Sequence, residues 1–307
     1  MSVTPEGYGR PVLKRIIVLG AGAVGSYYGA LLSRKNDVLL VGRRPHIEAI
    51  NSRGLILSGE VEGVFKVRGA TEISEVPDGS LLLLTTKAHD SERAVASIRD
   101  RLGEGVVILV LQNGLGNEEV VRRVVGERAE VIRGLVTSGI EFREPGRIFV
   151  RKVGETILGR GGREEEIARI FNECGLETRL SEDMPREIWR KLVMNCVINP
   201  LTALLRVPDN EVAADSLRDL RRRIVEECVA VARAEGVNLD MGILEELEGV
   251  IPSYRNFSSM CQDIMRGKRT EIDFLNGKVV ELGRRHGIET PVNEAMVSLI
   301  RFLEGRR

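Results

Sequence analysis

A lysine and two asparagines recur at four-residue spacing in the segment WRKLVMNCVINPLT, residues 189–202. Apolar residues fill most of the other positions, so we expect a largely buried helix. At about 100° per residue, Lys191, Asn195 and Asn199 fall on one narrow face of that helix. Polar side chains on a buried face cost free energy unless a partner satisfies them. The pattern therefore predicts either an internal polar network or a site for a polar small molecule.

A glycine-rich loop, GAGAVG at residues 20–25, lies between the apolar segment RIIVL and a helical segment. In such a loop the first glycine permits a tight turn, the second lets a pyrophosphate approach the backbone, and the third lets helix and strand pack closely. The helix start supplies free N–H groups to the phosphates. We expect a dinucleotide to bind here, at Gly20, Ala21, Gly22, Ala23, Val24 and Gly25.

The second apolar segment, DVLLV, indicates which nicotinamide cofactor is used. It is followed by Gly42, Arg43 and Arg44, with no carboxylate that could hold an unphosphorylated ribose. Arginine at this place can bind a 2′-phosphate with two hydrogen bonds, so Arg43 favours NADP(H), with NAD(H) as a further possibility. The alternative is that both arginines are solvated surface residues.

Two later strand ends carry polar residues. One apolar run ends in Thr85, Thr86 and Lys87, and another ends in Gln112 and Asn113. Ligands of open parallel sheets bind beyond the carboxyl ends of the strands, which makes Lys87 and Asn113 candidates for cofactor contacts. A surface lysine and a turn-forming Asn-Gly pair are the structural alternatives.

The order of the elements predicts the fold class. From residue 15 to about residue 138, short apolar runs alternate with helical segments, as in a doubly wound α/β domain with a mostly parallel sheet. The segments LILSG and VFKVRG indicate an inserted hairpin, and residues 140–158 indicate antiparallel strands that finish the sheet. From about residue 184 only helical periodicity remains. We expect an N-terminal arm over 1–14, a nucleotide-binding domain over 15–182 and an all-helical domain over 183–307.

Composition excludes several classes of function. The 45 basic and 45 acidic residues leave no net charge to hold a phosphate backbone, so we do not expect nucleic-acid binding. No apolar run of eighteen residues or signal-like start is present, which predicts a cytoplasmic protein without membrane insertion. The four cysteines are far apart and lack a CxxC pair, so neither a metal site nor a disulfide is expected.

The motifs together resemble those of the ketopantoate reductase (2-dehydropantoate 2-reductase) family over nearly the full chain. The matching segments are GAGAVG at residues 20–25, TTKA at 85–88, QNG at 112–114, WRKLVMNCVINPLTAL at 189–204 and SSMCQDIMRGKRTEIDFLNG at 258–277. The resemblance implies a Rossmann-type domain followed by a helical domain. It implies NADPH-dependent reduction of ketopantoate to (R)-pantoate, on the route to pantothenate and coenzyme A.

The resemblance also implies roles for single residues. Lys191 corresponds to the proton donor and Glu271 to a residue that contacts the cofactor and helps to position that lysine. Asn195, Asn199 and Ser259 correspond to substrate-binding residues, and Asn113 to a residue that contacts both cofactor and substrate. Asp209 departs from the pattern, because it stands where a substrate-contacting asparagine is expected. A carboxylate there would repel an anionic substrate unless it turned away.

Other functions fit part of the same pattern. A related reductase could act on another branched 2-keto acid, because the glycine loop and the lysine say little about the tail of the substrate. A non-catalytic NADP-binding regulator with this fold would bind cofactor without turnover. For Glu271 and Ser259 the structural alternatives are a helix-start carboxylate and an N-cap, and the asparagines could bridge helices. The apolar faces of the helical domain allow a homodimer.

Overall fold

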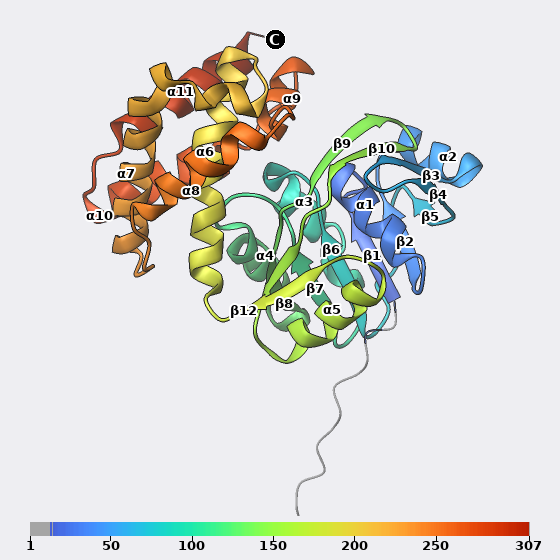
Figure 1. Ribbon diagram of the computed structural model, residues 1–307. Helices are drawn as coiled ribbons and strands as arrows, with labels where there is room; N and C mark the ends of the chain where they lie inside the picture. The colour runs from blue at the N-terminus through green and yellow to red at the C-terminus, as the bar shows by residue number, and fades with distance from the viewer. Residues whose placement is uncertain (1–12, 14, 307) are drawn as a thin grey trace, which may run out of the picture. The chain divides into compact units, whose positions relative to one another are not determined.

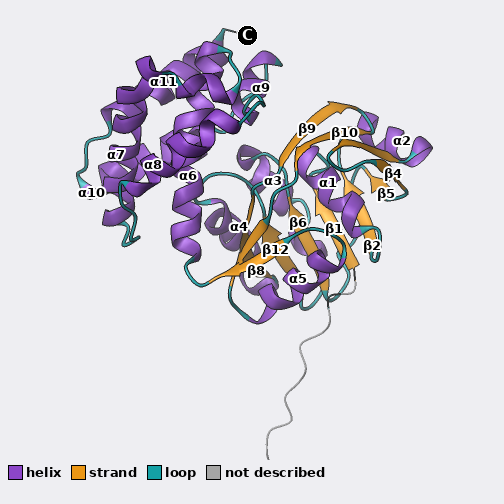
Figure 2. Ribbon diagram, viewed as in Figure 1, coloured by secondary structure: helices purple, strands orange, loops and turns teal. Residues whose placement is uncertain are grey.

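The computed structural model describes residue 13 and residues 15–306 (Figure 1). The expected N-terminal arm therefore falls, apart from Leu13, outside the described residues. The chain divides into two compact units. Of the described residues, unit 1 comprises residue 13 and residues 15–112, 118–157 and 161–179, and unit 2 comprises residues 113–117, 158–160 and 180–306. Strands are concentrated in unit 1, whereas helices dominate unit 2 (Figure 2).

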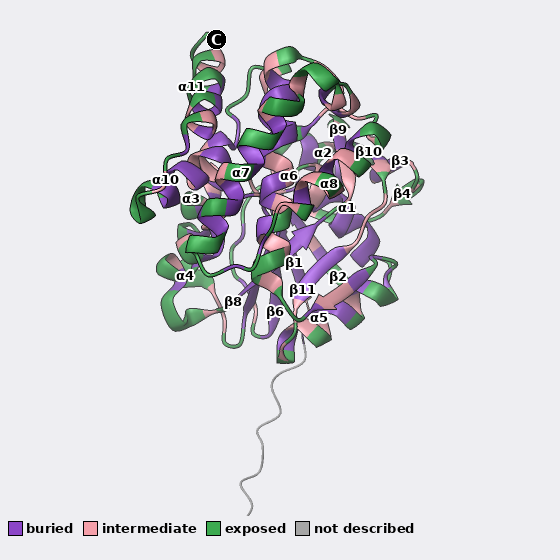
Figure 3. Cartoon of the chain, turned by 60° about the vertical axis from the view of Figure 1, so that its left-hand side comes forward, coloured by how far each residue is buried: buried purple, intermediate pink, exposed green. Residues whose placement is uncertain are grey.

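Unit 1 is built on an eight-stranded sheet with the strand order β12-β11-β8-β7-β6-β1-β2-β5. The neighbouring pairs from β8 through β5 are parallel, which confirms the predicted mostly parallel α/β sheet. The strands are β1 (Arg15–Leu19), β2 (Asp37–Val41), β5 (Arg68–Ala70), β6 (Ser80–Leu84), β7 (Val107–Val110), β8 (Glu130–Val136), β11 (Thr156–Gly159) and β12 (Thr178–Ser181). Strands β6 and β7 are buried throughout, as expected for a sheet covered on both faces (Figure 3).

The central strands end in register. Leu19 at the end of β1 pairs with Val41 of β2 on one side and with Leu84 of β6 on the other. The next strand follows the same alignment, because Leu84 pairs with Val110 of β7. The residues that follow these strands therefore leave the sheet at one edge.

A second sheet corrects two expectations from the sequence. It has the order β4-β3-β10-β9, formed by β3 (Leu55–Gly59), β4 (Gly63–Phe65), β9 (Gly139–Glu144) and β10 (Arg147–Lys152). The expected hairpin exists as β3 and β4, but β5 from the same stretch joins the main sheet. The antiparallel pair β9 and β10 does not finish the main sheet, because β10 pairs with β3 instead, whereas β11 at the end of the same stretch does join the main sheet beside β8. Alternation of polar and apolar residues predicts a half-buried strand but not the sheet that it joins.

Five helices accompany the described strands of unit 1. They are α1 (Ala23–Leu32), α2 (Arg44–Arg53), α3 (Ser91–Ala96), α4 (Asn117–Val125) and α5 (Gly162–Glu173). The tyrosines of α1, Tyr27 and Tyr28, are both about 1% exposed, and the Tyr28 ring packs edge-on against Phe171 of α5. These aromatic contacts fix the first helix, and with it the glycine loop that precedes it.

Unit 2 is formed by helices that enclose an apolar core. They are α6 (Met184–Leu205), α7 (Arg218–Ala234), α8 (Gly242–Val250), α9 (Ser259–Met265), α10 (Asn276–His286) and α11 (Pro291–Gly305), with short 3₁₀ segments η4 (Asp209–Ala213), η6 (Ile251–Ser253) and η7 (Ile272–Phe274). Helix α6 runs through this core, since Leu192, Val193, Cys196 and Val197 are at most 2% exposed. Among the described residues, no helix has the length and apolar character needed to cross a bilayer.

Candidate active site

The glycine loop connects β1 to α1 and is shaped by the strand ends around it. The amides of Gly20 and Ala21 both donate to the carbonyl of Val41, at 3.0 and 2.8 Å. Gly20 has a φ of +114°, and a Cβ there would lie within 2.7 Å of the Thr85 backbone. A Cβ on Gly25 would meet the Gly20 carbonyl and come within 2.9 Å of Val18 Cγ1. Both positions therefore require glycine on steric grounds.

The middle glycine is different. A Cβ on Gly22 would meet only the Gly20 oxygen, at 3.9 Å, so no described protein atom requires a glycine here. Gly22 is exposed and is the N-cap of α1, and no side chain caps that helix start. An open glycine before uncapped amides fits a phosphate group, which needs close approach to the backbone. The residues present thus fit the pyrophosphate of a dinucleotide.

Arg43 lies beside this loop. It follows Gly42, where an added Cβ would be 2.8 Å from the Cβ of Ala21. The Arg43 side chain is exposed, and it has no hydrogen bond or ion pair to any part of the chain that the structure describes. Its guanidinium is available for an anion next to the loop.

The end of β6 supports the loop from the other side. Thr85 Oγ1 donates to the Gly20 carbonyl at 2.9 Å, which fixes the first turn of the loop. The side chain of Gln112 is used structurally, because its Nε2 donates to Thr86 Oγ1 and to Ser91 Oγ. Lys87 follows at the same edge, is half-buried and begins a 3₁₀ turn.

Asn113 begins the short segment 113–117 that belongs to unit 2. The amide of Leu115 donates to the carbonyl of Phe274 at 3.1 Å, and Gly114, with a φ of +88°, packs so closely on Phe274 that a Cβ would lie 2.8 Å from its Cβ. Asn117 Nδ2 donates to the Asn113 carbonyl at 2.8 Å. The chain bends at Asn113 and Gly114, and the contacts of Gly114 and Leu115 with Phe274 attach this segment to η7, which follows Glu271.

The polar face of α6 carries the three residues that the sequence singled out. Lys191 and Asn195 are half-buried, and Asn199 is 6% exposed. Asn195 Nδ2 is buried and, within residues 13 and 15–306, has no hydrogen-bond partner. A buried amide without a partner costs about 1–3 kcal/mol. This unsatisfied donor does not bridge helices, which leaves it available for a ligand between Lys191 and Asn199.

Ser259 is the first residue of α9, but it does not cap that helix. The N-cap is Ser258, whose Oγ accepts from the Cys261 amide at 3.1 Å and bonds Thr202 Oγ1 at 2.7 Å. Ser259 itself is exposed. The alternative prediction that Ser259 is an N-cap is therefore wrong, because Ser258 caps α9.

Glu271 precedes η7 and is 8% exposed. Its carboxylate makes no capping hydrogen bond to that short helix, so the helix-start interpretation does not account for it. A buried carboxylate must be compensated by donors or cations, and its assigned place beside Lys191 and the cofactor stays a prediction.

Asn276 is a residue that the sequence interpretation missed. It is fully buried, and its Nδ2 donates to the Cys196 carbonyl and to Asn293 Oδ1, each at 2.9 Å. Pro200 lies inside α6 and has no N–H for the carbonyl four residues earlier, which is that of Cys196. The proline in the helical pattern was the available signal, because it leaves one carbonyl that another side chain must satisfy.

Asp209 lies in η4 and is 4% exposed. Its Oδ2 accepts from Asn256 Nδ2 at 2.5 Å. Burial raises the pKa of Asp209 to about 7, although hydrogen bonds from the Ser258 backbone and the Asn256 side chain oppose the shift. Oδ2 is thus engaged with protein, whereas Oδ1 is buried and, among the described residues, has no hydrogen-bond partner.

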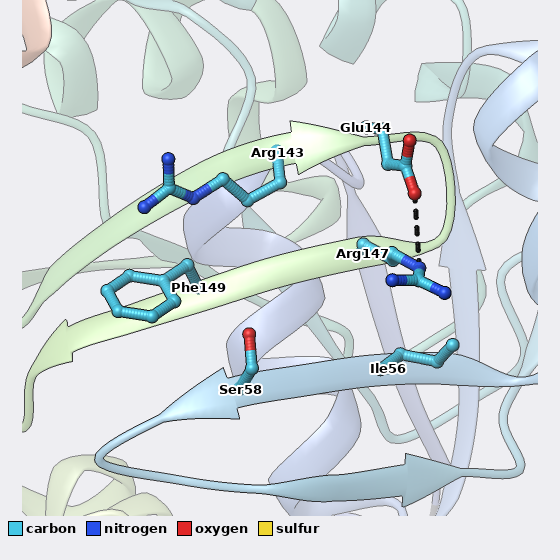
Figure 4. Close-up of a pocket in the computed structure, with 6 residues that line it drawn as sticks. All are labelled: Ile56, Ser58, Arg143, Glu144, Arg147 and Phe149. Carbon is cyan, nitrogen blue, oxygen red and sulfur yellow. Dashed lines mark ion pairs between the residues drawn. The ribbon is translucent and has the colours of Figure 1, made fainter.

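In the described part of the chain, neither a metal centre nor the hollow on the smaller sheet competes with this site. Among the described residues, no group of three His, Cys, Asp or Glu side chains could hold a metal ion. A hollow of about 260 Å³ lies on the smaller sheet of unit 1 (Figure 4). Both arginines that line it are paired, Arg147 with Glu144 and Arg143 with Glu141, each at 3.1 Å. Its arginines are thus already neutralised, unlike Arg43 beside the glycine loop.

Comparison with known proteins assigns the part of the chain with the glycine loop and the part with α6 to two domains of one family. Residues 16–163 match the family described as ketopantoate reductase PanE/ApbA, and residues 183–304 match its C-terminal domain. The 2-dehydropantoate 2-reductase of Pyrococcus horikoshii is 38% identical over 299 residues, which cover 94% of this chain and 97% of that relative.

Two solved structures extend the comparison. A PanE/ApbA family ketopantoate reductase from Ralstonia eutropha has a TM-score of 0.89 and 33% identity, covering 95% of this chain and 99% of the other. D-mandelate dehydrogenase in complex with NADH and anilino(oxo)acetate has a TM-score of 0.87 and 26% identity, with the same coverage. The glycine loop, the polar face of α6 and these matches lead to one assignment: the chain belongs to the ketopantoate reductase family.

Proposed function

We propose that this protein reduces 2-dehydropantoate (ketopantoate) to (R)-pantoate with NADPH, as a step of pantothenate and coenzyme A biosynthesis. Family membership over both units supports this activity. The observation that carries it is the buried, unsatisfied amide of Asn195 on the Lys191 face of α6. A donor in that state is expected where a polar ligand completes the hydrogen bonds.

The unit 1 residues provide the cofactor site in this proposal. The amides of the Gly20–Gly25 loop hold the pyrophosphate, Arg43 binds the 2′-phosphate, and Lys87 contacts the cofactor. The family resemblance assigns cofactor contacts to Asn113 and Glu271 as well. The absence of a carboxylate after β2 supports NADPH, and NADH is the second nicotinamide to be tested. When bound, NADPH supplies a hydride to the carbonyl carbon of the keto acid.

Lys191 supplies the proton in the same proposal. As the carbon accepts the hydride, the C=O electron pair moves to oxygen, which takes a proton from Lys191 Nζ and becomes the product hydroxyl. The ammonium also stabilises the negative charge that develops on this oxygen before the transfer. Solvent then returns a proton to the amine. Glu271 positions the lysine, and Asn195, Asn199 and Ser259 bind the carboxylate and hydroxyl of the substrate.

The test follows nicotinamide absorbance with purified protein, ketopantoate and each reduced cofactor in turn. Lys191→Ala should lower kcat by about 10²–10⁴, the usual contribution of a general acid, while NADPH binding survives. Lys278→Ala is the matched control, because this lysine pairs with Glu281 on α10. Near-normal turnover of Lys191→Ala would remove Lys191 from the role. Cofactor binding without turnover in the unmodified protein would instead support a non-catalytic regulator.

A reductase of another branched 2-keto acid is the second candidate. The similarity to D-mandelate dehydrogenase favours testing it, since that protein binds NADH and anilino(oxo)acetate in its solved complex. Parallel assays with ketopantoate, phenylglyoxylate and 2-ketoisovalerate give the ratio of kcat/KM values. A ratio in favour of ketopantoate of at least about 100-fold supports the first assignment.

We also propose that the enzyme acts in the cytoplasm as a homodimer. Exposed apolar side chains on α11, Leu299 and Phe302, supply surface for self-association. Light scattering coupled to size-exclusion chromatography distinguishes a mass of about one chain from a mass of two.

A further inference from the structure

Asp209 joins two segments of unit 2 that are far apart in sequence. Its Oδ2 accepts from Asn256 Nδ2 at 2.5 Å, and its backbone amide donates to the Asn256 carbonyl at 2.8 Å. The following amide, of Asn210, donates to the Tyr254 carbonyl at 3.1 Å. Three hydrogen bonds thus fasten the segment after α6 to the turn at residues 254–256.

The same turn leads directly to α9. Ser258 is 5% exposed, and its Oγ is held by Thr202 Oγ1 of α6 at 2.7 Å while it caps α9 at the Cys261 amide. Thr202 in turn donates to the Ile198 carbonyl at 2.8 Å, one residue before Asn199. Asp209 therefore anchors one end of a turn whose other end is fixed to α6, and Ser259 follows immediately.

We propose that Asp209 is a positioning residue, which holds the Tyr254–Ser258 turn so that Ser259 is presented for the keto acid, and that its own carboxyl group does not contact the substrate. This inference rests on the proposed function for the role of Ser259. It removes the conflict between a carboxylate at this place and an anionic substrate, because the group is buried against Asn256.

The attachment of residues 254–258 through Asp209 should depend on pH, because the side chain of Asp209 can ionise. Its pKa is raised by burial to about 7, so the neutral form predominates below that value. The titratable groups that face it are Tyr254 and Cys261, and the charge of Asp209 raises the pKa of each. The pKa of Cys261 is raised mainly by burial, and the positive charge of Arg206, at the end of α6, opposes that shift. Between the ordinary pKa of a carboxyl group and about pH 7, the opened turn ionises while the folded turn keeps Asp209 neutral, so the turn becomes less stable as the pH rises through this interval.

Amide hydrogen exchange of the free, full-length protein tests the anchoring without any substrate. Asp209→Ala should accelerate exchange of the amides of residues 254–261 about tenfold, because it removes the acceptor of the partly buried Asn256 side-chain amide. Asp209→Asn keeps an acceptor oxygen and should exchange within about twofold of wild type at about pH 4, where the carboxyl group is neutral in the folded and the opened turn. Glu211→Ala, an exposed change in the same 3₁₀ segment, is the control. Unchanged exchange in Asp209→Ala would overturn the proposal.

The pH dependence is measured on the same amides after correction for intrinsic exchange. The wild-type protein should lose protection as the pH rises from about 4 to about 7 and change little above pH 7, whereas Asp209→Asn should not, since it cannot ionise. Equal pH profiles for the two proteins would contradict the proposed hold. This comparison also stands if Asp209→Ala fails to fold.

Steady-state kinetics at pH 6 separates positioning from direct contact. Asp209→Ala should raise KM for the keto acid about tenfold, with kcat and KM for NADPH within about threefold, and Asp209→Asn should restore KM. A tenfold change of KM in Asp209→Asn at this pH, in either direction, would show that the carboxyl group meets the substrate. If ketopantoate is not the substrate, the predicted changes of KM will not be seen, but the predicted change of amide exchange will remain. The proposed reaction and the proposed role of Asp209 can therefore be rejected independently.

Discussion

The side-chain amide of Asn276 donates to the carbonyl of Cys196 at 2.9 Å, and this is the carbonyl that Pro200 leaves without a helical partner. The contact lies one residue from Asn195 on α6. Asn276 is itself held by Asn293, whose amide donates to a Glu227 carboxylate oxygen at 2.7 Å. Three helices, α7, α10 and α11, thus combine to satisfy one break in the hydrogen bonding of α6.

Asn276→Ala should lower the free energy of unfolding by about 2–3 kcal/mol, because it leaves the buried Cys196 carbonyl without a donor. Chemical denaturation followed by Trp189 fluorescence measures the loss, since the single tryptophan lies in α6. We also expect kcat/KM to fall, because Asn195 and Asn199 flank the unsupported turn.

A double-mutant cycle with Pro200→Ala provides the control. Alanine restores the N–H for the Cys196 carbonyl, so Asn276→Ala should cost at least about 1 kcal/mol less in that background. Strictly additive costs would mean that the proline and the asparagine are not coupled through this carbonyl.

Two glycines of the loop, Gly22 and Gly25, should respond differently to alanine. Gly25→Ala forces a Cβ against the Gly20 carbonyl and Val18, and we expect it to reduce the thermal stability of the protein. Gly22→Ala meets only an atom at 3.9 Å, so stability should change little while KM for NADPH rises at least about tenfold. Thermal denaturation and cofactor titration separate the two effects.

Gly249→Ala on α8 is the control for these substitutions, because a Cβ there meets nothing within 4 Å and its φ is not positive. Normal NADPH affinity in Gly22→Ala would contradict a pyrophosphate at this part of the loop.

Arg43→Ala should reduce the preference for NADPH. Loss of a charge-assisted contact to the 2′-phosphate is expected to raise KM for NADPH about tenfold, which corresponds to about 1.4 kcal/mol, and to leave KM for NADH within about twofold. The adjacent exposed arginine offers the matched comparison Arg44→Ala. Equal effects of Arg43→Ala on both cofactors would point to a general role of the side chain in place of 2′-phosphate recognition.

How far the sequence predicts this molecule depends on how local each feature is. The glycine loop is recognisable because its three glycines lie within six consecutive residues, 20–25, and the face of α6 because helical spacing brings Lys191, Asn195 and Asn199 together. Asn276 lies 80 residues from Cys196, and no spacing rule connects them. The sequence did not predict the second sheet for the same reason, since β10 pairs with β3, a strand about 90 residues earlier.

His46 is another such long-range contact, and it gives a pH-dependent prediction. Its ring is 3% exposed and lies between Ser26 Oγ and the Gly146 amide, each at 2.9 Å. The Gly146 N–H donates to Nδ1, so Nδ1 carries no proton and Nε2–H donates to the serine. Protonation would place a second proton against the Gly146 N–H. Burial lowers the pKa of His46 to about 4 from its ordinary value of 6.5.

Between these two pKa values the unfolded chain binds more protons than the folded one, so this histidine makes stability fall as the pH is lowered from about 6.5 to 4. The slope reaches at most about 1.4 kcal/mol per pH unit for one proton. Amide exchange of the β9–β10 turn reports the effect directly, because the Gly146 amide is the donor. His46→Gln should flatten the pH dependence of that exchange, whereas His286→Gln should not, because His286 pairs with Glu235 in unit 2. A turn whose protection is constant from pH 7 to pH 4.5 in the wild-type protein would show that His46 does not need to remain neutral.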